Sequence, residues 1–341
     1  MNPLLILLTA SILSQPYLPL ELGWERVSKK GSAPGHCHAI AYDTSRQKVI
    51  LWAAEPEPTG LWEWDGSAWT LIDSSGPQGF GDGIEMVYDE SREKLVWIGN
   101  AVKAANLETW EWDEKSWTKL PLKGPSTRSS FALAYDAARM RTVLFGGWRD
   151  VGNVFDDTWE YDGTKWMRVG QNSTGLLKPL FLDTSCIAPE PRDSHAMAYD
   201  RNRKKTVLFG GIQVCETHTK HFNGTWEWDG MRWTKASAGM NGRWGHTMAY
   251  DPILGKVIMF GGVGIQWNPT WAWDGEKWEV ISRSGPERRG RHSMAYDIAR
   301  KRMVLFGGLC GPQEYHDTWE YPSEYRVKII EEAKRKKSVT T

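Results

Sequence analysis

Short runs of alternating apolar and polar residues recur along the chain and are separated by turn residues, a pattern typical of β-strands. One run ends in Tyr-Asp six times, at an average spacing of about 51 residues. The tyrosines of these dipeptides are Tyr42, Tyr88, Tyr135, Tyr199, Tyr250 and Tyr296. A fixed period of this length indicates an internal repeat in which each unit is one small supersecondary structure.

Each repeat predicts four strands. The first ends at Tyr-Asp, the second ends ten residues after the tyrosine, and the third reads Thr-Trp-Glu-Trp-Asp or a close variant. The fourth begins with a second tryptophan seven residues after the first. Four repeats have Asp-Gly between the third and fourth strands, and this pair favours tight hairpins. We therefore expect an all-β fold, a six-bladed β-propeller with four antiparallel strands in each blade.

The sixth repeat stops before its fourth strand, and an extra strand at the N-terminus supplies the missing piece. Trp24 lies 18 residues before Tyr42, the same spacing that separates Trp117 from Tyr135. The segment around Trp24 thus has the register of a fourth strand. We expect it to complete the last blade and close the ring, which leaves no open sheet edge.

These motifs resemble the Kelch repeat family. A strand that ends in Phe-Gly-Gly is followed by Asp-Thr-Trp-Glu-Tyr-Asp-Gly-Thr-Lys-Trp in the third repeat, and repeats four to six are similar. The first two repeats depart from Gly-Gly, with Ala53-Ala54 and Gly99-Asn100. The resemblance covers about residues 23–321 and implies the propeller fold. Because Kelch-like propellers include both binding scaffolds and enzymes, it implies little about function.

The two ends of the chain differ from the repeats. Residues 1–22 contain an apolar run from Leu4 to Leu13, which suits a signal peptide and is too short to span a membrane. We expect export to a secreted or periplasmic location, or a cytoplasmic location if the segment is retained. Residues 322–341 predict a short basic helical tail.

Charge and composition exclude some classes of function. The 341 residues carry 42 basic and 42 acidic side chains, and this balance argues against nucleic acid as a partner. Of the 21 tryptophans, 16 fall in repeated positions and are expected to pack the blades together. The chain shows no phosphate loop, HExxH or dinucleotide motif, so we expect no cofactor, and we expect a monomer.

Loop lengths identify a candidate binding face. The first-to-second and third-to-fourth strand connections are constant in length, whereas the other two connections vary and project from the same side. Binding residues tend to lie on such variable loops. Three tryptophans outside the repeated positions, Trp148, Trp244 and Trp267, lie on this loop face and are candidates for stacking on sugars or anchoring a protein.

Arginine and histidine recur at the start of the first strand, where we expect the mouth of the central channel. The arginines are Arg128, Arg192, Arg243 and Arg289. A histidine follows each of the last three arginines after three positions, and these histidines are His195, His246 and His292. His38 occupies the equivalent position in the first repeat. Guanidinium groups in a ring suit a ligand carboxylate or phosphate. The alternative is that these side chains hold the loops by hydrogen bonds.

The cysteines allow two disulfides in an exported protein, Cys186 with Cys215 and Cys37 with Cys310, or else four buried thiols. Two groups could bind a metal, His36-Cys37-His38 and Cys215 with His218 and His221. Neither spacing matches an established zinc site, so we expect no metal.

Two functions fit these features. The first is a binding module that recognises a glycan or a protein through the loop face. The second, implied by the resemblance, is a sugar-active enzyme of the Kelch epimerase or oxidase kind that uses the arginines and histidines. Copper chemistry of the galactose oxidase kind is disfavoured, because no Tyr, Cys and His arrangement can be matched to it.

Overall fold

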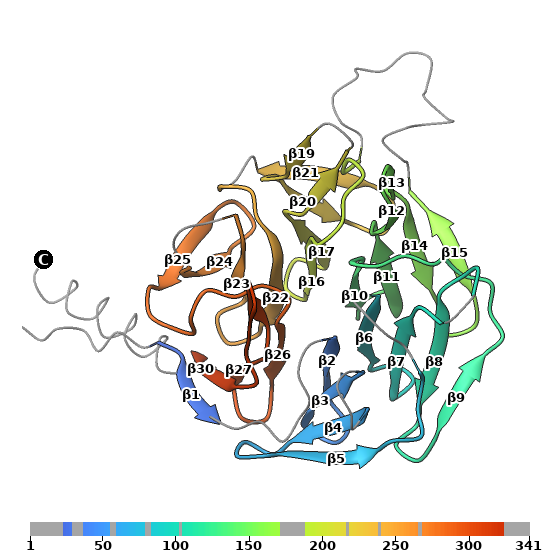
Figure 1. The fold of residues 1–341 in the computed structure, drawn as a ribbon, viewed down its shortest axis with the longest axis horizontal. Helices are drawn as coiled ribbons and strands as arrows, with labels where there is room; N and C mark the ends of the chain where they lie inside the picture. Colours follow the sequence, from blue (N-terminus) through green and yellow to red (C-terminus); the bar gives the residue numbers. More distant parts are fainter. Residues whose placement is uncertain are drawn as a thin grey trace, which may run out of the picture.

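The structure is a computed structural model, and it describes residues 23–28, 37–54, 59–78, 83–101, 104–170, 188–215, 218–237, 240–264 and 268–323. Six four-stranded antiparallel sheets form a ring around a central axis (Figure 1). The predicted all-β six-bladed propeller is confirmed. The predicted signal peptide and nearly all of the basic tail lie outside the described residues.

Each blade runs from an inner strand at the axis to an outer strand at the rim. The inner strands are β2 (His38–Asp43), β6 (Ile84–Asp89), β10 (Ala132–Asp136), β16 (Ala196–Asp200), β22 (Trp244–Asp251) and β26 (Ser293–Asp297). The second strands are β3 (Lys48–Ala53), β7 (Lys94–Gly99), β11 (Arg141–Phe145), β17 (Lys205–Phe209), β23 (Lys256–Val263) and β27 (Arg302–Phe306).

The two outer positions follow the same order around the ring. The third strands are β4 (Gly60–Trp64), β8 (Glu108–Trp112), β14 (Thr158–Tyr161), β20 (Thr225–Trp228), β24 (Thr270–Trp273) and β30 (Thr318–Pro322). The fourth strands are β5 (Trp69–Asp73), β9 (Trp117–Leu120), β15 (Trp166–Val169), β21 (Trp233–Ser237), β25 (Trp278–Ser282) and β1 (Glu25–Ser28).

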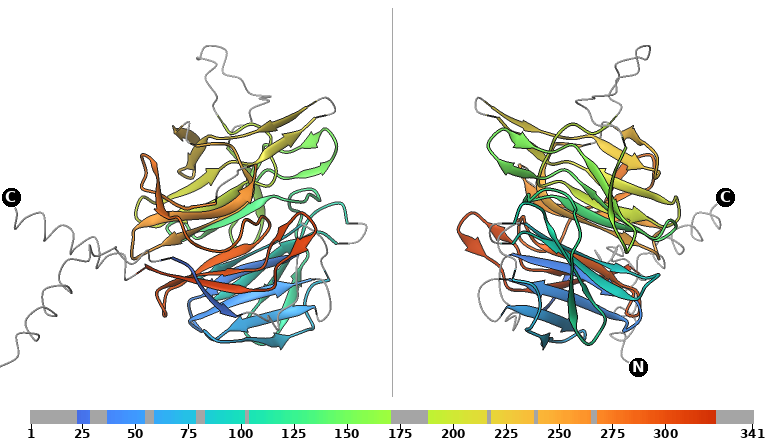
Figure 2. Two further views of the ribbon diagram at one scale, coloured as in Figure 1. Left: turned by 60° about the vertical axis from the view of Figure 1, so that its left-hand side comes forward. Right: turned by 90° about the vertical axis from the view of Figure 1, so that its right-hand side faces the viewer.

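Strand β1 closes the ring, as the sequence predicted. It pairs antiparallel with β30, with Arg26 opposite Trp319, and the two strands lie side by side in the side views as well (Figure 2). The indole of Trp24 donates a 2.8 Å hydrogen bond to Thr270 of blade 5. The fourth-strand tryptophans of blades 1, 3, 4 and 5 donate the corresponding bond to a threonine of the preceding blade. Trp24 is therefore the fourth-strand tryptophan of blade 6.

The repeated Glu of Thr-Trp-Glu also joins neighbouring blades. Glu227 of blade 4 pairs with Arg203 of its own blade and accepts a 3.2 Å hydrogen bond from the indole of Trp273 in blade 5. Glu320 of blade 6 and Trp64 of blade 1 make the same contact at 3.0 Å. The repeated glutamate therefore has a structural role, because it links a turn arginine of its own blade to the next blade.

Three of the variable connections between second and third strands fold into small hairpins. They are β12 (Trp148–Asp150) with β13 (Asn153–Val154), β18 (Ile212–Val214) with β19 (Thr219–His221), and β28 (Leu309–Cys310) with β29 (Gln313–Glu314). Blade 5 instead lengthens its two inner strands to eight residues each. The structure thus adds ordered elements to one face of the ring and leaves the opposite turns short.

Candidate ligand-binding cavity

The inner strands of all six blades enclose a central cavity of about 510 Å³. This volume is typical of small-molecule sites. The position three residues before each tyrosine, here called the channel position, contributes lining side chains from five blades: Glu85, Ala132, Ala196, Thr247 and Ser293. The next residue of each strand is apolar and packs mainly between blades, in order Ile40, Met86, Leu133, Met197, Met248 and Met294. Polar and apolar groups contribute about equally to the cavity wall.

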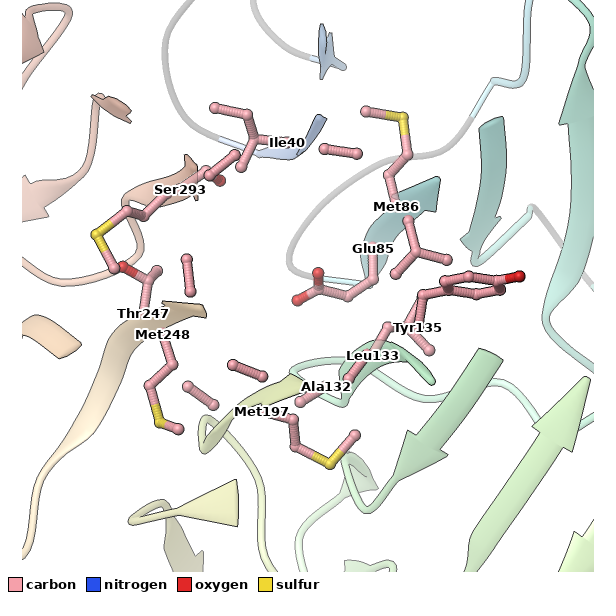
Figure 3. A pocket seen from close by; sticks show the side chains of 18 of the residues that line it. Ile40, Glu85, Met86, Ala132, Leu133, Tyr135, Met197, Thr247, Met248 and Ser293 are labelled. Atoms are coloured by element: carbon pink, nitrogen blue, oxygen red, sulfur yellow. The ribbon is translucent and has the colours of Figure 1, made fainter. Parts of the chain in front are cut away.

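Glu85 is the exception at the channel position. Its carboxyl group points from β6 into the open centre of the cavity, toward the side where Thr247 and Ser293 lie (Figure 3). No hydrogen bond or ion pair joins it to another residue in the part of the chain that the structure describes. Burial without a partner raises the pKa of Glu85 to about 8, because desolvation disfavours the charged form.

The two hydroxyl groups across the cavity are already engaged. Ser293 Oγ lies 2.7 Å from Nδ1 of His38 and donates a hydrogen bond of 3.2 Å to the His38 carbonyl oxygen. Thr247 Oγ1 lies 2.9 Å from Nε2 of His292. These contacts fix the hydroxyls within the wall and leave Glu85 as the polar group best placed to meet a ligand.

The four arginines predicted for the channel mouth are all 1–2% exposed. Arg289 donates a 3.0 Å hydrogen bond to the carbonyl oxygen of Gly307 and pairs with Asp317 at 2.5 Å. Arg128 makes the same kind of pair with Asp157, also at 2.5 Å. These groups hold the turn after the second strand from inside the blade, so the geometry favours the loop-holding alternative over ligand contact.

The other two arginines occupy similar positions. Arg192 donates a 3.0 Å hydrogen bond to the carbonyl oxygen of Gly210, and its guanidinium carbon lies 4.0 Å from the centre of the Phe222 ring. Arg243 lies 3.4 Å from the carbonyl oxygen of Gly261. Desolvation lowers the pKa of Arg192 to about 9 and that of Arg243 to about 10. Both remain charged at neutral pH.

The predicted histidines are buried between blades, where each packs against a phenylalanine of the preceding blade. The ring centres of His195 and Phe145 lie 5.5 Å apart, and those of His292 and Phe260 lie 5.6 Å apart. Desolvation, with a smaller effect of Arg192, lowers the pKa of His195 to about 3. Burial likewise holds the pKa of His246 and of His292 well below the usual value. These three rings are neutral at pH 7.

Each of these histidines also packs on a glycine of the preceding blade. A Cβ atom on Gly261 would lie 2.3 Å from Cε1 of His292, and one on Gly307 would lie 2.6 Å from Nε2 of His38. Gly146 and Gly210 face His195 and His246 in the same way. The blades that lack Gly-Gly, blades 1 and 2, precede the blades that lack this histidine. Gly-Gly and histidine therefore form one interblade contact, here called the Gly–His contact.

The two mouths of the cavity differ. On the loop face, main-chain hydrogen bonds of 2.8–2.9 Å run from blade to blade, from Ser194 to Ser130, from Gly245 to Ser194 and from Arg291 to Gly245. At the other mouth, Arg201 of blade 4 forms an ion pair with Glu90 of blade 2. The charged groups at this mouth neutralise one another, in contrast to Glu85 inside.

The structure describes two of the three predicted loop-face tryptophans. Trp148 lies on β12 with 38% of its surface exposed. Trp244 begins β22, is half-buried and stands opposite Val263 in the sheet. Trp267 lies outside the described residues. Two large apolar side chains on the blade 3 and blade 4 hairpins are exposed beside these, Val151 and Val214.

The predicted disulfide between Cys37 and Cys310 is absent from the structure. Cys37 packs against the apolar cluster between blades 1 and 2, whereas Cys310 lies on β28 of blade 6, so their side chains belong to different contacts. Cys215 is not in a disulfide, and its predicted partner Cys186 lies outside the described residues.

Among the residues that the structure describes, no three His, Cys, Asp or Glu side chains gather as a metal site would require. His36, one of the candidate ligands, lies outside these residues. Cys215 and His218 instead share a main-chain hydrogen bond of 2.9 Å in the turn before β19. No helix in the described part of the chain is long and apolar enough to cross a membrane.

Glu85 was missed by the sequence analysis, although the sequence contains a signal for it. The channel position carries Ala, Ala, Ala, Thr and Ser in the other five repeats. A glutamate among such small residues is the largest departure from the repeat within the inner strands. The arginines and histidines form a more obvious pattern, because they recur in most of the repeats.

Comparison with known proteins supports the fold. The solved structure of YjhT superimposes with a TM-score of 0.62 over 86% of this chain and 96% of that one, at 14% sequence identity. Such a low identity shows a shared propeller fold alone. No family model and no curated protein matches the chain, so the resemblance to the Kelch family stays a prediction.

Proposed function

We propose that this protein is a binding module that holds a small organic molecule in its central cavity, with Glu85 as the polar anchor. One observation carries the proposal, the lone carboxyl group that points into a cavity of about 510 Å³. A cavity of this size that contains an ionisable residue with a strongly perturbed pKa is a common form of ligand site. Nothing in the folding of the blade requires a glutamate here, since alanine fills the same position three times.

The arrangement favours binding over catalysis. General acid–base chemistry on a sugar needs two ionisable groups at the reacting atoms with pKa values driven apart. The buried histidines are neutral and pack against phenylalanine and glycine, and the arginines bond to main-chain carbonyls. Of the groups expected to act in an epimerase or oxidase, none in the described chain stands beside Glu85 to complete such a pair.

A second candidate function is recognition of a glycan or a protein by the loop face, in an exported protein. The observation in its favour is the exposed Trp148 together with Val151, which is 66% exposed, on the same hairpin. An exposed indole provides a flat apolar face on which a sugar ring can stack. Export to a secreted or periplasmic location belongs to this proposal.

Cavity-filling separates the two candidates. Ala132 is at the channel position of blade 3, so Ala132→Met places a larger side chain in the cavity, whereas Ala138→Met is a matched control in an exposed turn of the same blade. We expect a fragment library, screened by ligand-observed NMR, to yield binders that Ala132→Met weakens about tenfold or more and Ala138→Met does not. Binders that respond instead to Trp148→Ala, together with positive glycan-array spots, would establish the loop face and refute the cavity.

A further inference from the structure

We infer that the ligand of the central cavity is an organic cation whose ammonium nitrogen binds the Glu85 carboxylate. This inference rests on the proposed function, because it assigns a chemical class to the same site. It starts from the position of Glu85, which points into the cavity and has no partner among the described residues (Figure 3).

Charge complementarity selects a cation. The other ionisable groups that line the cavity, besides the six tyrosines, are Cys37, Glu90, Arg201, Arg291, His38, His195, His246 and His292. Arg201 and Glu90 pair with each other, and Arg291 is exposed at the loop-face mouth. His38 contacts Ser293 at 2.7 Å, and His195, His246 and His292 are neutral, so no cation in the described chain pairs with the Glu85 carboxyl. An anionic ligand would meet this carboxyl without compensation.

Binding should release a proton. Below its raised pKa the free Glu85 is protonated, and an incoming ammonium group stabilises the carboxylate. The balanced change is that a carboxylic acid and an ammonium ion give an ammonium–carboxylate pair and one proton to solvent. Desolvation by burial raises the pKa of Glu85. Affinity for an amine should consequently rise with pH between about 6 and 8.

Three probes of matched shape test the inference on the full-length protein: phenethylammonium, phenethyl alcohol and 3-phenylpropionate. By titration calorimetry at pH 7.5 we expect the ammonium to bind about tenfold tighter than the alcohol, and the carboxylate to bind weakest. In two buffers of different ionisation enthalpy, the heat should differ by an amount that corresponds to up to one released proton. A neutral contact would not produce that difference.

Variants identify the group responsible. Glu85→Gln should remove the preference for the ammonium, and Glu85→Ala, which installs the residue of three other blades, should do the same if the glutamine variant folds poorly. Glu93→Gln is the matched control. Glu93 is an exposed acid of the same blade, and the equivalent residue of blade 1 is Gln47. Both residues have a positive φ, 53° for Glu93 and 55° for Gln47, so glutamine suits this backbone conformation.

The outcomes separate the inference from the proposed function. Equal binding of ammonium and alcohol, both weakened by Ala132→Met, would overturn the inference and leave cavity binding established. An ammonium preference that survives Glu85→Gln would overturn it as well. Failure of all three probes, together with library binders that are insensitive to Ala132→Met, would refute the proposed function itself.

Discussion

The Gly–His contact shows that a repeated residue can stabilise the interface between two blades and not the interior of its own blade. Gly261 has φ of +78°, and a Cβ there would lie 2.3 Å from His292 and 2.7 Å from the carbonyl oxygen of Arg289. Glycine is needed for two reasons, since the left-handed conformation disfavours other residues and the neighbouring blade fills the space a side chain would take. A repeat alignment reveals both residues but not that they touch.

Replacement of this glycine should be far more costly than replacement of an unhindered one. We expect Gly261→Ala to lower the free energy of unfolding by about 3 kcal/mol or more, because backbone strain and a clash with a main-chain atom add up. Gly152 is the matched control, with φ of +86° and no atom within 4 Å of a built Cβ. Gly152→Ala should lose only about 1 kcal/mol from strain. Urea denaturation of both variants measures the difference, and equal losses would contradict the contact.

Strand β1 is the element on which closure of the ring depends. It brings Trp24 into a cluster with Phe260 of blade 5 and Tyr321 of blade 6, at ring-centre distances of 5.3 and 5.6 Å. In blade 6, the fourth strand comes from the N-terminus, yet its tryptophan donates the same hydrogen bond to a threonine of the preceding blade as in the blades built from one continuous segment. Closure is built from ordinary blade contacts and needs no special feature.

Loss of Trp24 should therefore open the ring. We expect Trp24→Ala to reduce the free energy of unfolding by about 3–5 kcal/mol, because a large buried side chain and its hydrogen bond are removed. Trp148→Ala is the control, since that indole is 38% exposed, and should cost less than about 1 kcal/mol. Thermal unfolding followed by tryptophan fluorescence would measure both. Similar melting temperatures for the two variants would show that β1 does not carry closure.

The contribution of Glu85 to the stability of the whole molecule should fall as pH rises toward 8. The pKa of Glu85 is raised in the folded state, so the folded protein holds a proton that the unfolded chain releases above about pH 4.5. This contribution to the free energy of unfolding then falls between about pH 4.5 and 8, by an amount on the order of a few kcal/mol. The buried His195, His246 and His292 act in the opposite direction below about pH 6.5, because their pKa values are lowered in the folded state.

Glu85→Ala should remove that dependence. Its stability should equal or exceed that of the natural protein near pH 4.5, and its advantage should grow up to pH 8. Glu93→Gln should follow the natural protein throughout. Denaturation in urea at several pH values measures the trend, and an advantage that is constant with pH would indicate that the Glu85 carboxyl is not buried as described.

The fold was predictable because its determinants are periodic. Six equally spaced tyrosines and the paired tryptophans specify blades, and the spacing of Trp24 specifies closure. The site was less predictable, because side chains of each inner strand alternate between the two neighbouring blades, as Ala39 and Ile40 do, and residues of both sets can reach the cavity. Arg192 and His195 were expected at the channel mouth from their place in the sequence, yet both are buried, Arg192 with a bond to the Gly210 carbonyl oxygen and His195 against Phe145 of the preceding blade. Glu85 could have been found only as a departure from its repeat.

The Gly–His contact also constrains how this propeller can change its number of blades. Blades 3 to 6 each offer Gly-Gly to the next blade, and blades 4, 5, 6 and 1 each supply the histidine that receives it. Removal or duplication of blade 4 or 5 leaves every such pair matched, whereas loss of blade 1 sets the Gly-Gly of blade 6 against Ile84. Blades 4 and 5 can therefore be lost or duplicated without breaking a Gly–His contact, and we call them the interchangeable arc. Blade 1 cannot, and we call blades 1 and 2, which both lack Gly-Gly, the fixed arc. Glu85, in blade 2, lies in the fixed arc, so a cavity remodelled by gain or loss of blades would keep its anchor.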